Sequence, residues 1–402
     1  MRLPILFILI TVIIDAMGIG LIMPVMPELI QEVQGGGLGT AALWGGLLAS
    51  GFAVMQFLCG PMIGALSDSV GRRPVLLISL AAMAVDYLVM AVAGSIWLLL
   101  AGRIFGGITA STYATAGAYM ADISKPEEKA ANFGLIGAAF GVGFVLGPIV
   151  GGLLGAYGTR APFYAAAALA AMNTIFGAVV MRETVTDRIR RAFTWRRANP
   201  LGAFRYLVGL PEIRVLMLGF FLFSVAFHVY PAVWAFFAEE RFGWGPGMIG
   251  LSLTLYGLAA ALVQGLLIRP ILRAVGDWRA VLYGLAFDMV VFAILAFVTN
   301  GAAALVLTPL TALGGVAMPA LQGIMSRATP DDAQGELQGL MASATALATI
   351  VSPLAMTSVF AAFTAPDTPI YLPGAPFLVS LVLVVAALAI FRKATPLSAQ
   401  EK

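Results

Sequence analysis

Charged residues, cysteine and histidine are scarce in this chain of 402 residues. Only 11% of the residues are charged, 60% are apolar, and Cys59 and His228 are the single cysteine and the single histidine. A soluble protein of this length needs more charge to cover its surface. One cysteine excludes an internal disulfide, and no His/Cys cluster is present to bind a metal. The sequence also lacks a Gly-Lys-Ser/Thr phosphate loop and a nucleophile–base pair, so we expect no ATP-driven pump, no enzyme and no cofactor.

Long apolar runs occupy most of the chain. Each run has about twenty residues, enough to cross a hydrocarbon layer as a helix, whereas a β-barrel would show short alternating segments. The first run contains Asp15 and lacks a small-residue cleavage site, so we expect a retained helix and not a signal peptide. We therefore predict an all-α integral membrane protein with twelve spans. They are expected at 4–26, 41–63, 74–93, 96–120, 131–155, 161–181, 214–238, 247–271, 280–299, 302–325, 338–362 and 373–391.

The positive charges test this layout. With loops assigned alternately to the two sides, nearly all lysines and arginines fall on the side that holds both termini. Arg160 and Arg241 alone fall on the opposite side, and Arg103 lies inside a span. The positive-inside rule therefore places both termini in the cytoplasm. The net charge of +3 follows from these cytoplasmic loops at the surface of the lipid bilayer, so it requires no nucleic-acid partner.

The two halves of the chain repeat each other around a basic linker. We expect a six-helix bundle at 1–181, a cytoplasmic linker at 182–213 and a second six-helix bundle at 214–402. The linker is either an amphipathic helix on the anionic inner leaflet or a solvated connector. Gly134 matches Gly339 and Pro148 matches Pro353, each pair 205 positions apart. Such repeats predict two bundles related by pseudo-twofold symmetry, with a substrate site near the membrane midplane.

One loop between spans carries a dense motif. It joins the second and third expected spans and contains Gly64, Asp68, Gly71, Arg72 and Arg73. This G-x-x-x-D-x-x-G-R-R pattern resembles the loop between helices 2 and 3 of the major facilitator superfamily of secondary transporters. The resemblance implies a cytoplasmic gate, in which Asp68 accepts hydrogen bonds from Arg72 or from backbone amides at the start of the eleventh expected span, 338–362. A loop that only sets the topology is the alternative.

Further segments resemble the twelve-helix drug:proton antiporters of that superfamily. They lie at 15–27, 102–107 and 143–152. The third segment is the antiporter motif associated with export, and its residues are Gly143, Gly147, Pro148, Gly151 and Gly152. The glycines imply close helix packing and Pro148 implies a bend, with packing alone as the alternative. Within the antiporters, residues 121–123, 199–200, 234, 318–322 and 334–339 resemble the tetracycline-efflux branch.

Ionisable residues inside the spans are the candidates for proton coupling. Asp15, Asp86, Asp288 and Arg103 all lie well within expected helices. Such residues are costly in a bilayer, so they normally face a cavity or a charged partner. We predict that the three acids serve proton coupling, with Asp86 either carrying protons or orienting the substrate, and that Arg103 keeps Asp15 ionised until drug or proton displaces the pair. The alternative for Asp15 or Asp86 is a structural pairing with Arg103 or with backbone donors.

Sparse polar residues are the candidates for substrate binding. We assign this role to Gln56, His228, Gln264 and Gln322, although each is more often a helix–helix hydrogen bond, and for His228 a purely structural bond is favoured. Tetracycline exporters of this type carry a histidine in helix 8, a few residues before a glutamine. Residues 258–263, which precede Gln264, contain no histidine. The sequence therefore predicts poor handling of tetracycline, or coupling that rests on the acids alone.

These observations predict one mechanism and leave two alternatives. We expect a proton-coupled antiporter that exports a small amphiphilic drug, tetracycline-like or another antibiotic, by alternating access across the bacterial inner membrane. Its partners would be protons and the drug, either alone or as a drug–cation complex. Proton-coupled uptake of a metabolite on the same fold is the first alternative, and a non-transporting scaffold or sensor is the second. The export-type glycines and the intramembrane acids favour the antiporter.

Overall fold

The structure is a computed structural model that describes residues 3–186, 190–195, 199, 211–330 and 333–393. The described residues form helices and connecting turns, with no strand among them. Much of the expected basic linker lies outside these ranges, as do Pro200 and the pair Asp331–Asp332.

The chain divides into two compact units. Unit 1 comprises Met1–Gly37, Leu47–Pro200 and Trp244–Thr254, and unit 2 comprises Leu38–Gly46, Leu201–Gly243 and Leu255–Lys402. Two helix ends are thus exchanged, because 38–46 belongs to unit 2 and 244–254 belongs to unit 1. The bundle boundaries expected from the sequence did not include this exchange, which depends on packing between segments far apart in the chain.

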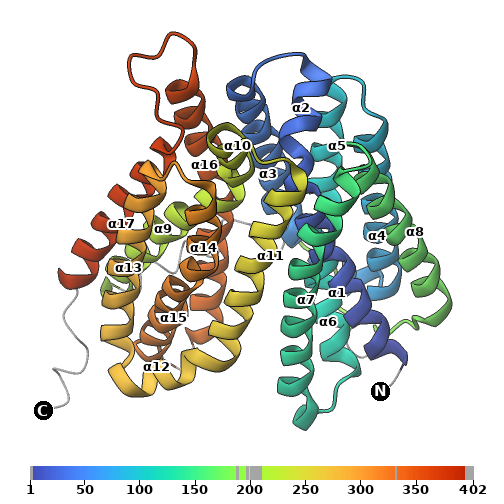
Figure 1. Cartoon of the computed structure of the whole chain (residues 1–402). Coiled ribbons are helices and arrows are strands. Elements are labelled where there is room, and N and C mark those ends of the chain that lie inside the picture. Colours follow the sequence, from blue (N-terminus) through green and yellow to red (C-terminus); the bar gives the residue numbers. More distant parts are fainter. Residues whose placement is uncertain (1–2, 187–189, 196–198, 200–210, 331–332, 394–402) are drawn as a thin grey trace, which may run out of the picture. The chain divides into compact units, whose positions relative to one another are not determined.

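The first half of the chain supplies six expected spans (Figure 1). Their elements are α1 (Leu3–Ile22), η1 (Met23–Val25), α2 (Met26–Gln34), α3 (Leu38–Val70), α4 (Arg72–Val92), α5 (Ile96–Thr109), α6 (Thr112–Ile123), η2 (Pro126–Glu128), α7 (Lys129–Gly155) and α8 (Ala161–Val180). Within unit 1, α7 packs along α1 and α8 packs along α4.

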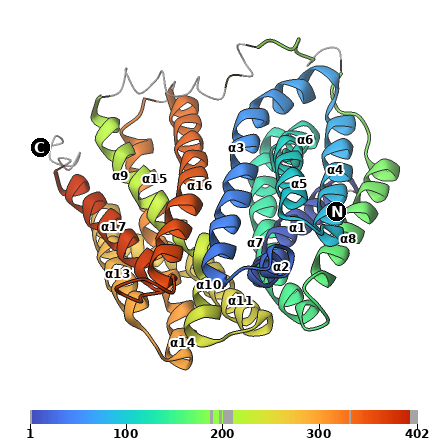
Figure 2. The ribbon, with the colours of Figure 1, turned by 90° about the horizontal axis from the view of Figure 1, so that it is seen from above.

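The second half repeats the same order. Its elements are α9 (Pro211–Phe227), α10 (Val229–Phe242), α11 (Pro246–Leu262), η4 (Val263–Leu267), α12 (Ile268–Val275), α13 (Asp277–Phe297), α14 (Gly301–Leu310), η5 (Thr311–Val316), α15 (Ala317–Arg327), α16 (Gln334–Thr364) and α17 (Ala375–Lys393). Within unit 2, α9 lies beside both α16 and α17 (Figure 2).

Eleven stretches of the described residues are long and apolar enough to cross a membrane as helices. The expected span at 96–120 is the twelfth, and a break at Ala110 and Ser111 divides it into α5 and α6. Side-chain hydrogen bonds form at this break. Gln56 Nε2 donates to the Ala110 carbonyl (3.3 Å), and the Ser79 and Ser111 hydroxyls lie 3.1 Å apart. Polar groups freed at a break inside a membrane require such partners. The chain is a multi-pass membrane protein, and its twelve-helix organisation matches the expectation.

Candidate functional site

A buried ion pair joins α4 to α5 in unit 1. Arg103 Nη2 pairs with Asp86 Oδ2, and only 8% of Arg103 and 3% of Asp86 is exposed. α5 comes close at Gly102 and Gly106, and a Cβ at Gly106 would lie 2.6 Å from Asp86 Oδ2. The Arg103 guanidinium also lies 5.0 Å from the centre of the Phe52 ring. The glycines therefore make room for the carboxylate, and the arginine balances its charge.

Asp15 lies on α1 in the same unit and is half-buried. Tyr87 interacts electrostatically with Asp15, Asp86 and Arg103, and its hydroxyl packs against Gly18 of α1, where a Cβ would overlap it. The structure pairs Arg103 with Asp86 and not with Asp15, which corrects the pairing in the mechanism inferred from the sequence. The reason is that α5 packs against α4, whereas α1 packs mainly against α7 and α8.

Asp288 is the buried acid of unit 2. It lies on α13 with 0% of its surface exposed, and among the described residues no donor lies within hydrogen-bonding distance of either carboxylate oxygen. η5 comes close at Gly314, where a Cβ would overlap Asp288 Oδ1. The third span of each unit thus presents an acid to a glycine of the fourth span. Asp86 has an arginine partner, and Asp288 has none among the described residues.

Aromatic rings border the Asp288 side of unit 2. The Tyr230 ring centroid lies 6.2 Å from that of Tyr256 and 5.7 Å from that of Phe292. Phe292 follows Asp288 by one turn of α13. Asp288 interacts electrostatically with both phenols. An unpaired charge in such surroundings is costly, so a buried acid of this kind is weak as a stabilising device. The presence of such an acid therefore points to function.

Two of the four predicted substrate residues make hydrogen bonds within their own unit. His228 lies at the junction of α9 and α10, where Nδ1 lies 2.6 Å from the Ser224 carbonyl and Nε2 lies 3.0 Å from Thr349 Oγ1. Gln56 Nε2 is bound to the carbonyl at the break after α5. For both residues the structure contains the helix–helix bond that was the alternative to substrate binding.

Gln264 and Gln322 are exposed residues of unit 2. Gln264 lies in η4, a π-helical turn, and such turns occur often at functional sites. η4 packs against η5, the segment that presents Gly314 to Asp288. The fold therefore brings the turn that carries Gln264 to the segment that faces the buried acid. Gln56 belongs to unit 1, so these residues are not collected in a single unit.

The loop motif forms a charge network at the start of α4. Gly71 has a φ of 128°, which few other residues adopt, and turns the chain from α3 into α4. Arg72 then pairs with Asp68 at 2.5 Å and with Asp122 of α6 at 3.3 Å. Of the two partners predicted for Asp68, Arg72 is thus in contact. Gly64, the first residue of the motif, accepts a hydrogen bond from Ser67 Oγ at 2.8 Å through its carbonyl.

Glu183 completes this network and was not singled out from the sequence. Its carboxylate accepts the backbone N–H groups of Arg72 (2.9 Å) and Arg73 (3.1 Å), the first residues of α4. A carboxylate is favourable there because the first N–H groups of a helix have no partner inside the helix. Arg73 Nη2 in turn donates to the Ala178 carbonyl near the end of α8, at 2.8 Å.

Unit 2 contains a counterpart of this network with the charges reversed. Asp277 begins α13 and pairs with Arg327 at the end of α15. Asp277 lies 205 positions after Arg72, and Arg327 lies 205 positions after Asp122, the spacing already seen between the repeated glycines and prolines. That spacing matches the two pairs of positions in the sequence, and the contact within each pair is seen only in the structure. α13 carries its own acid at its start, whereas α4 takes one from Glu183.

We expect transport to tolerate an exchange of the two charges between positions 277 and 327. Asp277→Arg places two arginines together and is expected to lower transport. Asp277→Arg/Arg327→Asp restores the pair in the polarity that unit 1 uses, so transport is expected to recover. Because Arg327 is mostly exposed, each change should alter stability by less than ~1 kcal/mol. Initial transport rates at matched expression measure the effect. A double variant as slow as the single one would contradict a role for the pair.

The glycines of the antiporter motif lie on α7. Gly143, Gly147 and Gly151 face α1, where a Cβ on each would overlap backbone atoms of Ile13, Met17 or Leu21. Gly152 instead faces the first turns of α11, which belong to unit 1. Pro148 lies inside α7, and its ring packs against Gly20 of α1. The motif therefore gives α7 two close contacts, one with α1 and one with the exchanged end of α11.

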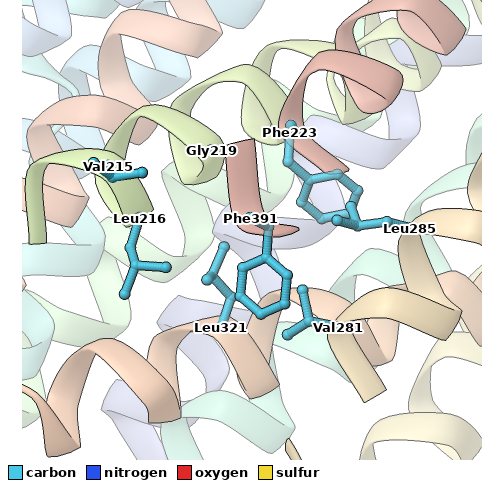
Figure 3. Close-up of a pocket in the computed structure, with 9 residues that line it drawn as sticks. Val215, Leu216, Gly219, Phe223, Val281, Leu285, Leu321 and Phe391 are labelled. Carbon is cyan, nitrogen blue, oxygen red and sulfur yellow. The ribbon is translucent and has the colours of Figure 1, made fainter. Parts of the chain in front are cut away.

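A small apolar cavity lies within unit 2, between α9, α13, α15 and α17 (Figure 3). Phe223, Leu285, Leu321 and Phe391 contribute to its wall, which contains no charged side chain. A cavity without polar groups gives a polar ligand nothing to bind, so we do not assign it to the substrate.

Comparison with known proteins gives a consistent family assignment. The sequence profile of the Major Facilitator Superfamily matches residues 8–353. The chain is 46% identical to the class C tetracycline resistance protein of Escherichia coli, with 88% of each chain covered. It is 39% identical to the class G protein of Vibrio anguillarum, with 87% of this chain and 88% of that protein covered.

Solved structures agree on the fold. The human organic anion transporter MFSD10 (TETRAN) is 26% identical, with a TM-score of 0.69 over 97% of this chain and 99% of that one. The nucleoside transporter NupG is 14% identical, with a TM-score of 0.80 over 98% and 100% of the two chains. At that identity the second likeness concerns the fold alone.

Proposed function

The chain belongs to the major facilitator superfamily, whose members are transporters and not enzymes, and on that premise we propose that it is a proton-coupled antiporter that exports a tetracycline-like drug. The single observation that carries the coupling is Asp288, an acid buried completely in a membrane bundle with no described hydrogen-bond donor. Intramembrane acids without a partner are typical of proton pathways. The tetracycline resistance proteins cited above supply the substrate class.

In this mechanism the two acids on third spans have different roles. Asp288 takes a proton from outside and releases it to the cytoplasm as drug is captured, because no described arginine balances its charge. Asp86 is held by Arg103, so the pair responds to substrate or to Asp15 through Tyr87. Gln264 and Gln322 supply polar contacts to the drug, and His228 serves as a fixed bond between α9 and α16. Both termini lie in the cytoplasm of a bacterium, with the charge network at Asp68 acting as a gate on that side.

Uptake of a metabolite is the competing function on the same fold. The sequence similarity to resistance proteins and the glycine ridge of α7 favour export. The absence of a histidine shortly before Gln264 does not contradict export, because Asp288 remains to carry protons. A drug–cation complex would present a cationic ligand to these acids, and it belongs to the same proposal.

We expect the chain to protect bacteria that lack their own drug exporters. Growth is measured across a series of tetracyclines and unrelated amphiphilic antibiotics, with a protonophore to collapse the gradient. Protection against a tetracycline, lost with the protonophore, is the expected result. His228→Ala should leave most protection in place, because His228 is bound on both ring nitrogens within unit 2. Drug accumulation above that of cells without the protein would instead support uptake and contradict the proposal.

A further inference from the structure

Two arginines break the charge pattern of the chain. Arg160 and Arg241 are the basic residues that the topology places on the side opposite the termini. Cations are disfavoured there by the positive-inside rule, so each calls for a specific explanation. In the structure both arginines donate to backbone carbonyls at the end of a helix.

In unit 1 the target is the end of α4. Arg160, just before α8, donates from Nη1 to the carbonyls of Ala91 (2.9 Å) and Ala93 (2.8 Å). Its Nε donates to Glu32 of α2 at 3.1 Å, and Thr159 donates to the same carboxylate at 2.5 Å. Arg160 therefore ties together the end of the first span, the end of the third span and the turn before the sixth.

In unit 2 the target is the end of α13. Arg241, near the end of α10, donates from Nε to the Val298 carbonyl at 3.0 Å. Its neighbour Glu240 accepts a hydrogen bond of 2.6 Å from Tyr371, in the loop before α17. Partial burial, together with the bond to Glu240 and the charge of that carboxylate, raises the pKa of Tyr371 to about 12, so the phenol keeps its proton. The same three places are joined as in unit 1.

The two arginines do not occupy equivalent positions in the repeat. Arg160 comes from the turn before the sixth span of its half, and Arg241 comes from the end of the first span of the other half. Ancestry from one repeated residue would place them at matching positions. Two different elements instead supply a guanidinium to the same target, the end of the third span. The common feature is therefore the helix that is held, and not the residue that holds it.

The two helices whose ends bind these arginines are also the helices that carry the buried acids. α4 contains Asp86 and α13 contains Asp288. The last carbonyls of a helix lack partners inside the helix, and a cation at that end also interacts favourably with the helix dipole. From Asp86 to Ala93 is roughly 10 Å along a helix, and from Asp288 to Val298 is roughly 15 Å. When the end of a stiff helix is anchored, the acid on that helix is kept at a fixed depth in the membrane.

We propose that Arg160 and Arg241 are positioning residues, which fix the depth of Asp86 and Asp288 by anchoring the outer ends of α4 and α13. The inference rests on the proposed proton coupling. The titratable and charged groups around the acids are Arg103, Tyr87 and Asp15 at Asp86, and Tyr230 and Tyr256 at Asp288. Changing either arginine leaves all of these residues chemically intact, so a change in the behaviour of the acid reports the loss of the anchor.

The test uses Arg241→Gln and Arg241→Lys, with Arg279→Gln as the matched control. Arg279 is an exposed arginine at the opposite end of the same helix, α13. For Arg241→Gln we expect turnover to fall roughly fivefold with KM unchanged, and the midpoint of the pH profile to move by about half a unit or more. Arg241→Lys keeps a cationic donor and should recover part of the loss. Arg279→Gln should match the wild type.

A second readout observes the acid directly. Dicyclohexylcarbodiimide modifies protonated carboxyl groups in apolar surroundings, and mass spectrometry measures its rate of reaction at Asp288 in the purified full-length protein. We expect this rate to change in Arg241→Gln and not in Arg279→Gln, and the corresponding change at Asp86 in Arg160→Gln. This readout needs no transport, so it tests the positioning role even where the wild type moves no protons and the proposed function fails.

A purely stabilising role gives a different result. In that case Arg160→Gln and Arg241→Gln lower the thermal stability or the yield, while the remaining protein keeps the wild-type pH profile and carbodiimide rates. That outcome overturns the proposal, as do equal effects in Arg279→Gln.

Discussion

Asp288→Asn is expected to abolish proton movement while substrate still binds. The amide has the shape of the carboxyl group and fits beside Gly314, but it cannot load or release a proton. In inverted vesicles with an imposed pH gradient, adding drug should release protons from the lumen for the wild type and give no release above background for the variant. Drug resistance in cells should fall to the level of cells without the protein.

Asp367→Asn is the matched control for that experiment. Asp367 is exposed in the loop between α16 and α17, so the same chemical change is made away from the buried site. The control should transport drug and move protons like the wild type. Substrate binding, measured by the quenching of tryptophan fluorescence, separates loss of coupling from loss of folding. Normal drug-induced proton release by Asp288→Asn would remove the main proton carrier from the mechanism.

Arg103→Leu is expected to have the largest effect on stability. It leaves Asp86 buried on α4 without its counter-charge, and removing one partner of a buried pair typically costs ~3–5 kcal/mol. The double variant Asp86→Asn/Arg103→Leu removes the charge as well, so it should recover much of this loss. Thermal unfolding of the purified protein in detergent measures both effects.

The double variant is also informative about transport. If the ion pair only holds α5 to α4, restored stability should bring back transport. If the pair takes part in coupling, the double variant should be stable and inactive. A single variant as stable as the wild type would contradict the burial and pairing seen in the structure.

Much of the architecture follows from the sequence because the membrane limits the choices. Spans must be apolar and of a set length, and basic loops must lie on one side, so composition and charge predict the number and order of the helices. The repeat of 205 positions relates the two halves through residue identities alone. The same physics identifies Asp86 and Asp288 as functional candidates, because a charge in a span needs a reason to be there.

The sequence did not predict which charged groups meet. Asp15 and Asp86 were both plausible partners for Arg103, and the packing of α5 on α4 selected Asp86. Asp277 and Arg327 are far apart in sequence, and each looks like an ordinary loop charge until the fold joins them. The roles of Glu183, Arg160 and Arg241 likewise depend on which helix end lies within their reach.

For this protein, the sequence alone determined the membrane environment, the helix count, the family and the set of ionisable residues inside the spans. Only the tertiary structure decided that Arg103 balances the charge of Asp86 while no described residue pairs with Asp288, that the fourth span breaks at Ala110, and that residues 38–46 group with unit 2 and residues 244–254 with unit 1. The physical reason is the sequence separation over which each interaction acts. Hydropathy and helix signals act over neighbouring residues, whereas charge pairing and close packing depend on contacts between residues tens to hundreds of positions apart.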